Sequence, residues 1–320
     1  MTAMSAPTAP QAQPDSPGQP EPQPSRRRRG AAVPYALLVP AVAILVLALG
    51  YPMVWQTWTS FLQFGLAQQF GKPPTFVGLT NYTRLFTDPQ TWAVVGRSIA
   101  FCLVNAAITV VLGVLIALLM NAVGTVTRLV LQVAMLLAWA MPVIASMTVW
   151  IWVFDWRRGI VNWGLTQLGL DFTNHNWLEQ PLSFYFVATV IVVWMSVPFV
   201  AVSVYAALTQ ISDEVMEAAA LDGATPRQRF FAIIMPMIRP VLMIVTLLQV
   251  IWDLRVFAQI KMLQDAGAPT ASTDLLGTYI YRLGVGSSDF GMASALSIFV
   301  LILTVALSFF YVVHLMKEDS

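Results

Sequence analysis

Long apolar runs separated by shorter polar stretches make up most of the chain. Six runs are long enough to cross a bilayer, which takes roughly 20 apolar residues in a helix. They lie near residues 33–55, 94–120, 129–154, 184–208, 240–260 and 292–316. Backbone groups in lipid must be hydrogen-bonded within the chain, and these runs are too long for barrel strands. The pattern therefore predicts an all-α membrane protein whose six transmembrane helices form one domain at 33–316.

The first 32 residues have a different composition. Seven prolines fall before residue 25, among Gln, Ser and Ala, and Arg26–Arg29 follow them. Such a segment cannot bury enough apolar surface to offset its ordering entropy, so we expect residues 1–32 to be a disordered tail. No small-residue cleavage site stands out after the next apolar run, which we interpret as an uncleaved first span rather than a signal peptide.

The distribution of positive charge predicts the orientation of the chain. Six spans place both termini on one side, and nine of the 17 lysines and arginines then lie on that side, against six on the other. The arginines of the tail and of the loop at 209–239 mark this side as cytoplasmic under the positive-inside rule. We therefore expect a multi-pass protein of the cytoplasmic membrane with cytoplasmic N- and C-termini.

Overall composition narrows the possible functions. Hydrophobic residues make up 58% of the chain and charged residues 10%, with a mean hydropathy of +0.71. A soluble domain carries about 25% charge, so an ordinary soluble enzyme is excluded. The net charge of +1 gives no attraction to nucleic acid. One cysteine, Cys102, excludes an intramolecular disulfide framework, and two histidines make a histidine-based metal centre improbable.

The loop at 209–239 has the sequence signals of two short helices. Ser212 is a typical N-cap residue, and Asp213 and Glu214 follow in the first turn, where carboxylates suit the helix dipole. Gly223 stands where a C-capping glycine belongs. Thr225-Pro226-Arg227-Gln228 then supplies a second N-cap, a proline at the first helical position and a capping-box glutamine.

The second of these helices continues toward the fifth apolar run. Its apolar positions recur at helical spacing, and Pro236 should kink it. The loop also has small residues that would let another surface approach closely, namely Ala218, Ala219, Ala220, Gly223 and Ala224. A docking element and a plain structured loop both fit this pattern.

One motif in the loop is specific. Glu217-Ala218-Ala219, then Gly223 after three residues, then Ile233-Ile234-Met235-Pro236 after nine more resembles the EAA motif of permease subunits of ATP-binding cassette (ABC) importers, with methionine for leucine at Met235. Val77–Tyr82 and the Asp253–Phe257 stretch look like the sugar-permease branch of the maltose and glycerol-3-phosphate importer type. The resemblance covers about residues 33–316.

This resemblance implies a fold and a set of partners. The expected architecture is the six-helix fold of a type I ABC importer permease, with a cytoplasmic coupling helix. The expected partners are a second permease subunit, ATPase subunits that bind the ATP, an extracytoplasmic solute-binding protein and membrane lipid. The chain itself would hold no cofactor. The expected solute is a di- or oligosaccharide, with glycerol-3-phosphate or another polyol derivative next, carried across a bacterial inner membrane. The coupling residues implied are Glu217, Ala218, Ala219, Gly223, Ile233 and Pro236.

Missing motifs agree with this interpretation. None of the three lysines is followed by Ser or Thr, so the chain has no P-loop and ATP must bind elsewhere. An ion-coupled secondary transporter or channel, the main alternative, would place several ionisable residues in mid-membrane. The apolar runs hold few, namely Asp253, Arg255 and, nearer an edge, Arg97. An intramembrane enzyme is disfavoured because the chain has no HExxH or GxSxG motif.

Three residues of the fifth run are candidates for the substrate path. Gln249, Asp253 and Phe257 are spaced four residues apart, which predicts one helix face. A carboxylate near mid-membrane costs about 2.5–3.5 kcal/mol and should face a wet cavity or a partner. An amide and a carboxylate can bind sugar hydroxyls, and an aromatic ring can cover a sugar's apolar face. The alternative is a buried ion pair between Asp253 and Arg97 or a residue of the second permease.

Deleting residues 2–24 tests the interpretation of the tail. We expect solute uptake by the assembled system to stay near wild type, because a disordered segment makes no packing contacts and only the arginines orient the first span. Uptake of radiolabelled solute by intact cells measures this. Failure of the complex to assemble would instead identify the tail as a docking segment.

Overall fold

The computed structural model describes residues 32–318, so the predicted tail lies outside the described residues except for its last position. The chain divides into two compact units after Met53. The first unit contains α1 (Ala32–Leu45), a π-helical turn η2 (Val46–Gly50) and the start of α2 (Tyr51–Thr59). Leu38–Thr59 forms an apolar helix of 22 residues that is long enough to span a membrane.

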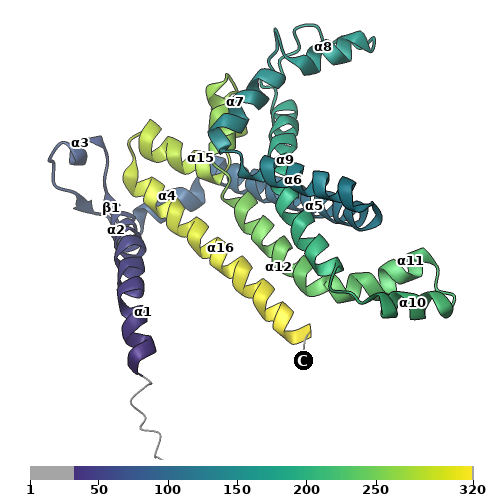
Figure 1. Ribbon diagram of the computed structural model, residues 1–320. Helices are drawn as coiled ribbons and strands as arrows, with labels where there is room; N and C mark the ends of the chain where they lie inside the picture. Colours follow the sequence, from purple (N-terminus) through teal and green to yellow (C-terminus); the bar gives the residue numbers. More distant parts are fainter. Residues whose placement is uncertain (1–31, 319–320) are drawn as a thin grey trace, which may run out of the picture. The chain divides into compact units, whose positions relative to one another are not determined.

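The second unit is almost entirely helical (Figure 1). Its elements after α2 are β1 (Leu62–Gln63), α3 (Leu66–Gln69), β2 (Thr75–Phe76), α4 (Thr80–Thr87), α5 (Pro89–Ala122), α6 (Thr125–Ala140), α7 (Val143–Val153), α8 (Ile160–Gln167), α9 (Pro181–Leu208), α10 (Asp213–Leu221), α11 (Pro226–Arg229), η3 (Phe230–Ile234), α12 (Met235–Leu254), α13 (Ala258–Asp265), α14 (Thr270–Thr273), α15 (Leu276–Tyr281), η4 (Arg282–Gly286) and α16 (Phe290–Glu318). The two short strands pair antiparallel, with Leu62 opposite Phe76.

The described residues contain five helices that are long and apolar enough to cross a membrane. They are Leu38–Thr59, Pro89–Ala122, Pro181–Leu208, Pro226–Asp265 and Phe290–Val313. A sixth span results if α6 and α7 count as one, although the two are bent by 100°. The prediction of an all-α membrane protein is confirmed, but the third predicted span at 129–154 is not one helix.

Proline breaks this third span. Met141 and Pro142 both have extended backbone, with ψ of 128° and 136°. Pro142 has no N–H to donate to the preceding turn, and its ring disfavours the helical conformation at Met141. The chain therefore leaves α6 and starts α7 in a new direction.

The fifth predicted span, 240–260, lies within a longer helical segment, Pro226–Asp265. The helical run begins at Pro226, because α11, η3 and α12 follow one another without a break. It leaves α-helical geometry after Leu254, three residues before α13. Leu254 and Val256 are buried in two different hydrophobic clusters. The three residues outside α-helical geometry therefore stand where the chain passes from one cluster to the other.

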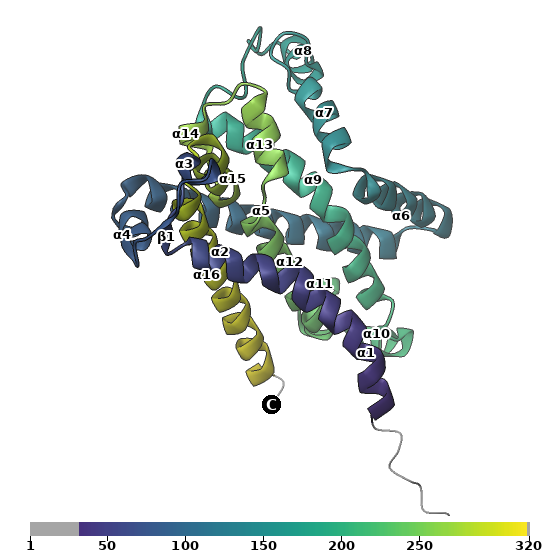
Figure 2. The same ribbon diagram turned by 90° about the vertical axis from the view of Figure 1, so that its left-hand side faces the viewer.

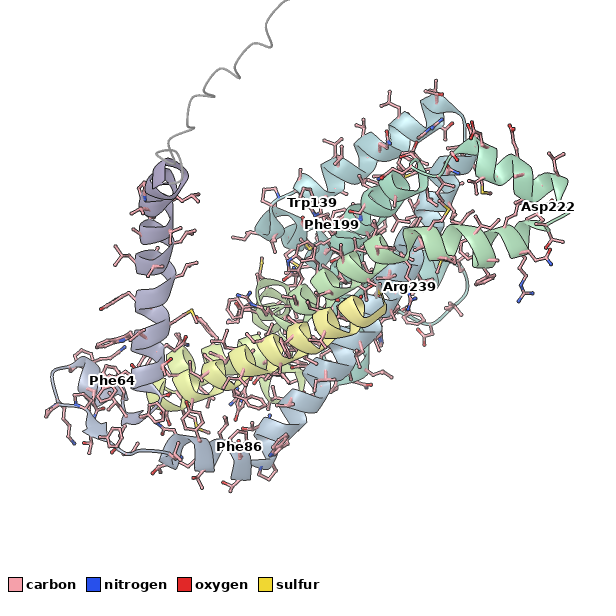
Figure 3. The ribbon with its side chains drawn as sticks, turned by 90° about the horizontal axis from the view of Figure 1, so that it is seen from below. Phe64, Phe86, Trp139, Phe199, Asp222 and Arg239 are labelled. Atoms are coloured by element: carbon pink, nitrogen blue, oxygen red, sulfur yellow. The ribbon has the colours of Figure 1, made fainter. Side chains whose placement is uncertain are left out.

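α5 and α9 form the most extensive helix pair, and α6 and α12 pack against it (Figure 2). At Gly113 the two backbones approach so closely that a Cβ atom would lie 2.5 Å from Val200 Cγ1. α12 packs against both helices, and α6 packs against α9. Trp139 of α6 stacks on Phe199 of α9 with ring centroids 6.3 Å apart (Figure 3).

The segment at 77–82 has a structural role in the fold. Gly78 has a φ of +57°, which favours glycine. The buried Asn81 side chain donates hydrogen bonds of 2.9 Å to the carbonyls of Ser60 and Leu62, where α2 gives way to β1. The Tyr82 hydroxyl lies 2.8 Å from Ser60 Oγ. Asn81 and Tyr82 therefore hold the junction between α2 and β1 in place.

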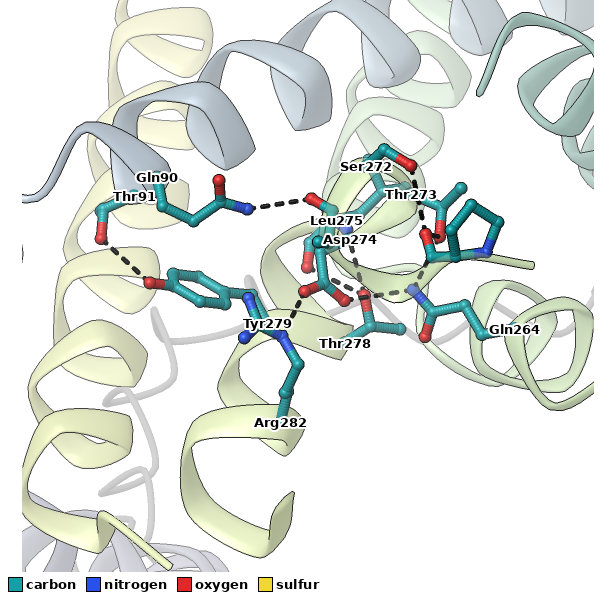
Figure 4. Close-up of polar contacts among 12 residues, drawn as sticks. Gln90, Thr91, Gln264, Ser272, Thr273, Asp274, Leu275, Thr278, Tyr279 and Arg282 are labelled. Carbon is teal, nitrogen blue, oxygen red and sulfur yellow. Dashed lines mark hydrogen bonds and ion pairs between the residues drawn. The ribbon is translucent and has the colours of Figure 1, made fainter. Parts of the chain in front are cut away.

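The segment between α12 and α16 is fastened to α5 by buried polar contacts (Figure 4). Asp274 is buried and accepts hydrogen bonds from Arg282 Nε at 2.6 Å and Gln264 Nε2 at 3.1 Å. The Leu276 N–H donates to Ser98 Oγ of α5 at 2.8 Å. A buried charge is tolerated when it is paired and hydrogen-bonded, so these contacts hold the segment in one position.

The N-terminus of α5 is tied to the same segment through Asp88. Burial acts to raise the pKa of Asp88, but hydrogen bonds from the Gln90 N–H and the Tyr279 and Thr91 hydroxyls outweigh it and lower the pKa below its usual value. A lowered carboxyl pKa adds stability above the ordinary pKa of the unfolded chain. This stability is lost as the pH falls toward the lowered value.

Gly113→Ala tests the close approach of α5 and α9. The added methyl group would clash with Val200, so we expect the free energy of unfolding to fall by about 1–3 kcal/mol. Thermal unfolding of the detergent-solubilised protein measures this. Gly96→Ala is the matched control, since no atom lies within 4 Å of a Cβ at that position of the same helix. Equal unfolding temperatures for the two variants would contradict the packing argument.

Candidate functional site

α10 and α11 form a hairpin at one end of the bundle, where α9 ends and α12 begins (Figure 1). Asp222 lies at the far tip of the hairpin and Arg239 near its base (Figure 3). The two short helices predicted for the loop at 209–239 are therefore present.

Gly223 ends the first helix as predicted. Its φ is +77°, and the turn is a complete Schellman motif. The Ala224 N–H donates to the Ala219 carbonyl at 3.0 Å, and the Gly223 N–H donates to the Ala220 carbonyl at 3.1 Å. At the other end, Ser212 occupies the N-cap position, although its side chain makes no capping hydrogen bond.

The predicted capping box starts the second helix. The Gln228 N–H donates to Thr225 Oγ1 at 3.3 Å, and Gln228 Oε1 accepts from the Thr225 N–H at 2.8 Å. Pro226 occupies the first turn. These local bonds make the hairpin self-contained, because both helix ends at its tip are satisfied without help from the bundle.

The six predicted coupling residues do not all reach the surface. Glu217, Ala218, Gly223 and Pro236 are exposed, and Ile233 is partly buried. Ala219 is buried, with 8% of its surface exposed, so the expectation that all the small residues of the loop are exposed is wrong. Its methyl group lies on the side of α10 that packs against the rest of the chain.

Two large apolar side chains on the hairpin face outward. Leu221 is 89% exposed and Phe231 is 60% exposed. Phe231 lines an open groove of about 510 Å³ with Thr225, Arg227, Gln228 and Ala232. Apolar side chains gathered on a polar loop indicate a protein interface. Neither residue was among the predicted coupling residues, although an apolar side chain within a polar loop is a usable signal in the sequence.

The hairpin continues into the bundle without an interruption. α11 passes through the π-helical turn Phe230–Ile234 directly into α12. Pro236 follows this turn and cannot donate a backbone hydrogen bond to the residue four positions before it. A π-helical turn takes up this mismatch, so the predicted kink is replaced by a locally widened helix.

Gln249 and Asp253 lie together on the buried face of α12. Gln249 Nε2 donates to Asp253 Oδ1 at 2.8 Å. Gln249 Oε1 and Asp253 Oδ2 are buried and have no hydrogen-bond partner among the described residues. Two acceptor oxygens inside an apolar span are costly unless a ligand or another chain satisfies them.

Phe257 does not share this face, which corrects the prediction. α12 ends at Leu254, and Phe257 is the N-cap of α13 with φ −134° and ψ −62°. Its ring packs against Tyr281, with centroids 5.5 Å apart. The four-residue spacing counts only within a continuous helix, and tertiary packing ends this one before Phe257.

The ion pair suggested between Asp253 and Arg97 is absent. Arg97 Nη1 and Nη2 each donate to the Ala271 carbonyl at 3.2 Å. The other suggested pairing, with a residue of a second permease, is not tested by a single chain.

Two further polar residues in the spans were missed. Asn105 and Thr109 of α5 are fully buried, and Asn105 Oδ1 and Thr109 Oγ1 have no partner among the described residues. They lie one turn apart on the helix that packs against α12. Polar residues four positions apart within an apolar run were the signal available in the sequence.

The chain matches known transport proteins over most of its length. Residues 109–315 match the family of binding-protein-dependent transport system inner membrane components. The diacetylchitobiose uptake system permease protein DasB of Streptomyces coelicolor is 41% identical over 92% of this chain and 89% of its own length. The trehalose/maltose transport system permease protein MalF of Thermococcus litoralis is 31% identical over 88% of this chain and 93% of its own length.

A solved structure agrees with this family on the fold. The crystal structure of a bacterial ABC transporter involved in the import of the acidic polysaccharide alginate contains a chain with a TM-score of 0.77 and 24% identity, covering 90% of this chain and 96% of that one. The predicted fold of an ABC importer permease is therefore confirmed. The chain belongs to the family of binding-protein-dependent transport system inner membrane components, and it is a multi-pass membrane transport component rather than an enzyme.

Proposed function

We propose that this chain is a permease subunit of an ATP-driven carbohydrate importer, coupled through the hairpin at 209–239 to separate ATPase subunits. The observation that carries the proposal is the hairpin itself. It keeps the EAA spacing, closes both helix ends at its tip with its own capping bonds, and directs Leu221 and Phe231 away from the bundle. Such a rigid element with an apolar outer surface suits docking into a groove of another subunit.

The coupling residues divide into contact and support groups. Glu217, Ala218 and Gly223 are exposed and would meet the ATPase directly. The Glu217 carboxylate forms no ion pair or hydrogen bond with the described residues, so it is free to pair with a basic residue across the interface. Ala219, Ile233 and Pro236 would act by shaping the hairpin and its junction with α12.

A carbohydrate is the solute class that fits best. Similar permeases are named for diacetylchitobiose and for trehalose or maltose, and a chain of similar fold belongs to an importer of alginate. In this chain α5 and α12 carry four unpaired buried oxygens, those of Asn105, Thr109, Gln249 and Asp253, in addition to the unpaired Nε of Arg97. Sugar hydroxyls are the donors that such oxygens need. We propose that Gln249 and Asp253 contact the solute, with a lesser role for Phe257.

The orientation follows from charge and from the hairpin. Arg227, Arg229 and Arg239 lie on or beside the hairpin, at the end of the bundle that we place in the cytoplasm. The segment between α12 and α16 then lies outside, where a solute-binding protein would deliver its ligand. A second permease subunit completes the path, as the EAA resemblance implies.

An ion-coupled transporter is not favoured. The spans contain few ionisable side chains, and Arg97 does not pair with Asp253. The structure therefore offers no chain of titratable groups across the membrane, within the described residues, of the kind that proton coupling uses.

Gly223→Asp tests the coupling role. A left-handed residue with a side chain costs about 1–2 kcal/mol, and nothing lies within 4 Å of a Cβ there in this chain. We expect the variant to insert into the membrane. It should lose solute-stimulated ATP hydrolysis, because a charged side chain would occupy the space of the docked ATPase. Hydrolysis by the complex in proteoliposomes measures this.

Gly169→Asp is the matched control for this variant. Gly169 has a φ of +85°, ends α8 in the same type of Schellman turn, and also has nothing within 4 Å of a Cβ. Its backbone strain should be similar, so we expect coupled hydrolysis to survive. Equal hydrolysis by both variants and the wild type would show that the hairpin tip does not couple the subunits.

Asp253→Asn tests the substrate path. Asparagine can still accept the Gln249 hydrogen bond but loses the charge, so KM for solute uptake should rise about tenfold or more, the cost of one hydrogen bond to a charged group. Asp265→Asn, an exposed carboxylate beside Lys261 on α13, is the control and should leave uptake unchanged. Low protein levels, restored by changing a residue of the second permease, would instead indicate a structural ion pair. Unchanged uptake at normal levels would exclude both roles.

A further inference from the structure

Two adjoining cavities run along the seam between α5 and α9. The larger, of about 650 Å³, is lined by residues of α5, α6 and α9. The smaller, of about 230 Å³, is lined by Arg97, Ala100, Phe101, Val104, Tyr185 and Thr189. Thr189 lines both cavities, so they adjoin one another, and we call the two together the α5–α9 groove.

One stripe of α5 forms the floor of this groove. Arg97, Val104, Ile108, Leu112 and Ile116 line it at spacings of seven and four residues, which places them on one helix face. At 1.5 Å per residue, the distance from Arg97 to Ile116 is about 28 Å. The groove therefore extends over nearly the whole depth of a hydrocarbon core, which is about 30 Å thick.

The two parts of the groove differ in polarity. Its deeper part, the larger cavity, is lined by aliphatic and aromatic side chains, among them Leu112, Ala134, Ala138, Val193 and Trp194. The sequence offers no hydrogen-bonding side chain there apart from Thr189 and the Trp194 indole. A sugar would leave its hydroxyl groups unsatisfied in such a place, so the deeper part does not suit the solute.

The smaller cavity is lined by a cation, Arg97, that has no carboxylate partner among the described residues. Arg97 makes its two hydrogen bonds to one backbone carbonyl, and its Nε is buried without a partner. Among the described residues it forms no ion pair with a carboxylate. The Tyr185 hydroxyl, which lines the same cavity, is also unpaired. A guanidinium and a phenol together suit a phosphate oxygen.

We propose that the α5–α9 groove binds one phospholipid, with its phosphate at Arg97 and Tyr185 and an acyl chain in the apolar part. Arg97 lies about 12 Å along α5 from Pro89, within reach of the headgroup region by extension of its side chain. A phospholipid has an anionic head and an apolar tail. The groove likewise has Arg97 in its smaller cavity and apolar side chains along its larger one. Lipid binding requires only that the chain spans a membrane, so this proposal does not depend on which solute the protein carries.

A transmembrane helix fits the groove less well. A helix is about 10 Å across, so only one edge of it could enter either cavity. An acyl chain is narrow enough to lie inside.

Native mass spectrometry of the detergent-purified complex tests the proposal. After exchange into phosphatidylglycerol, the wild type should retain one tightly held lipid and should prefer it to diacylglycerol, which has no phosphate. Arg97→Ala should lower retention about tenfold, the loss expected for hydrogen bonds to a charged group. Ile108→Trp should lower it similarly, because the indole fills the apolar part.

Matched controls separate binding from misfolding. Arg84→Ala removes an arginine that already has a carboxylate partner, Asp289, at 3.4 Å. Val111→Trp adds the same indole to an exposed position of α5 outside the groove. Both variants should retain the lipid. Arg97→Lys keeps the positive charge and should retain more lipid than Arg97→Ala.

Three results would overturn the proposal. The first is equal retention by the wild type, Arg97→Ala and Ile108→Trp. The second is detachment of a partner permease by Ile108→Trp while the lipid stays bound, which would show that a protein helix fills the groove. The third is equal affinity for diacylglycerol, which would show that no headgroup is recognised at Arg97.

Discussion

The contact between α5 and α9 is the packing constraint on which the positions of α6 and α12 depend. Gly113 lets the backbone of α5 approach Val200 at a distance that no side chain would permit. α12 then packs against both helices and α6 against α9. Since helices in lipid gain little from the hydrophobic effect between them, close approach at small residues is the main source of their association. The polar residues of α5 and α12, and the groove beside α9, lie on the helices that this contact brings together.

The hairpin and the buried polar pair belong to one helical run. From Pro226 to Leu254 the chain is helical throughout, with a single π-helical turn at Phe230–Ile234. Under the proposed function, a displacement of the hairpin by the ATPase would be carried along α12 to Gln249 and Asp253, about 40 Å away by helical rise. The capping bonds at Gly223 and Thr225 keep the hairpin rigid enough to transmit such a movement, and the π-helical turn is the place where the run could bend.

Local signals predicted the hairpin and hydropathy predicted the all-α membrane fold, whereas the end of α12 and the burial of Ala219 depend on tertiary packing. The cap at Gly223 and the capping box at Thr225 depend on neighbouring residues only, so the sequence alone located them. Pro142 carried a signal for the break between α6 and α7 that hydropathy alone overlooked. The end of α12 had no such signal, because it results from the burial of Leu254 and Val256 in different clusters. Phe257 was therefore assigned to a helix face that does not exist, and Ala219 was expected at a surface that it does not reach.

The central claim is that the hairpin docks against a separate ATPase subunit, and thiol labelling tests it most directly. Leu221→Cys introduces a thiol at a position that is 89% exposed, while the native Cys102 is buried. Leu168→Cys, at a position that is 79% exposed near the end of α8, serves as the reference. The account predicts that adding the ATPase to the permease slows maleimide labelling at 221 and leaves labelling at 168 unchanged. Labelling at 221 that proceeds at the same rate in the fully assembled complex would contradict it.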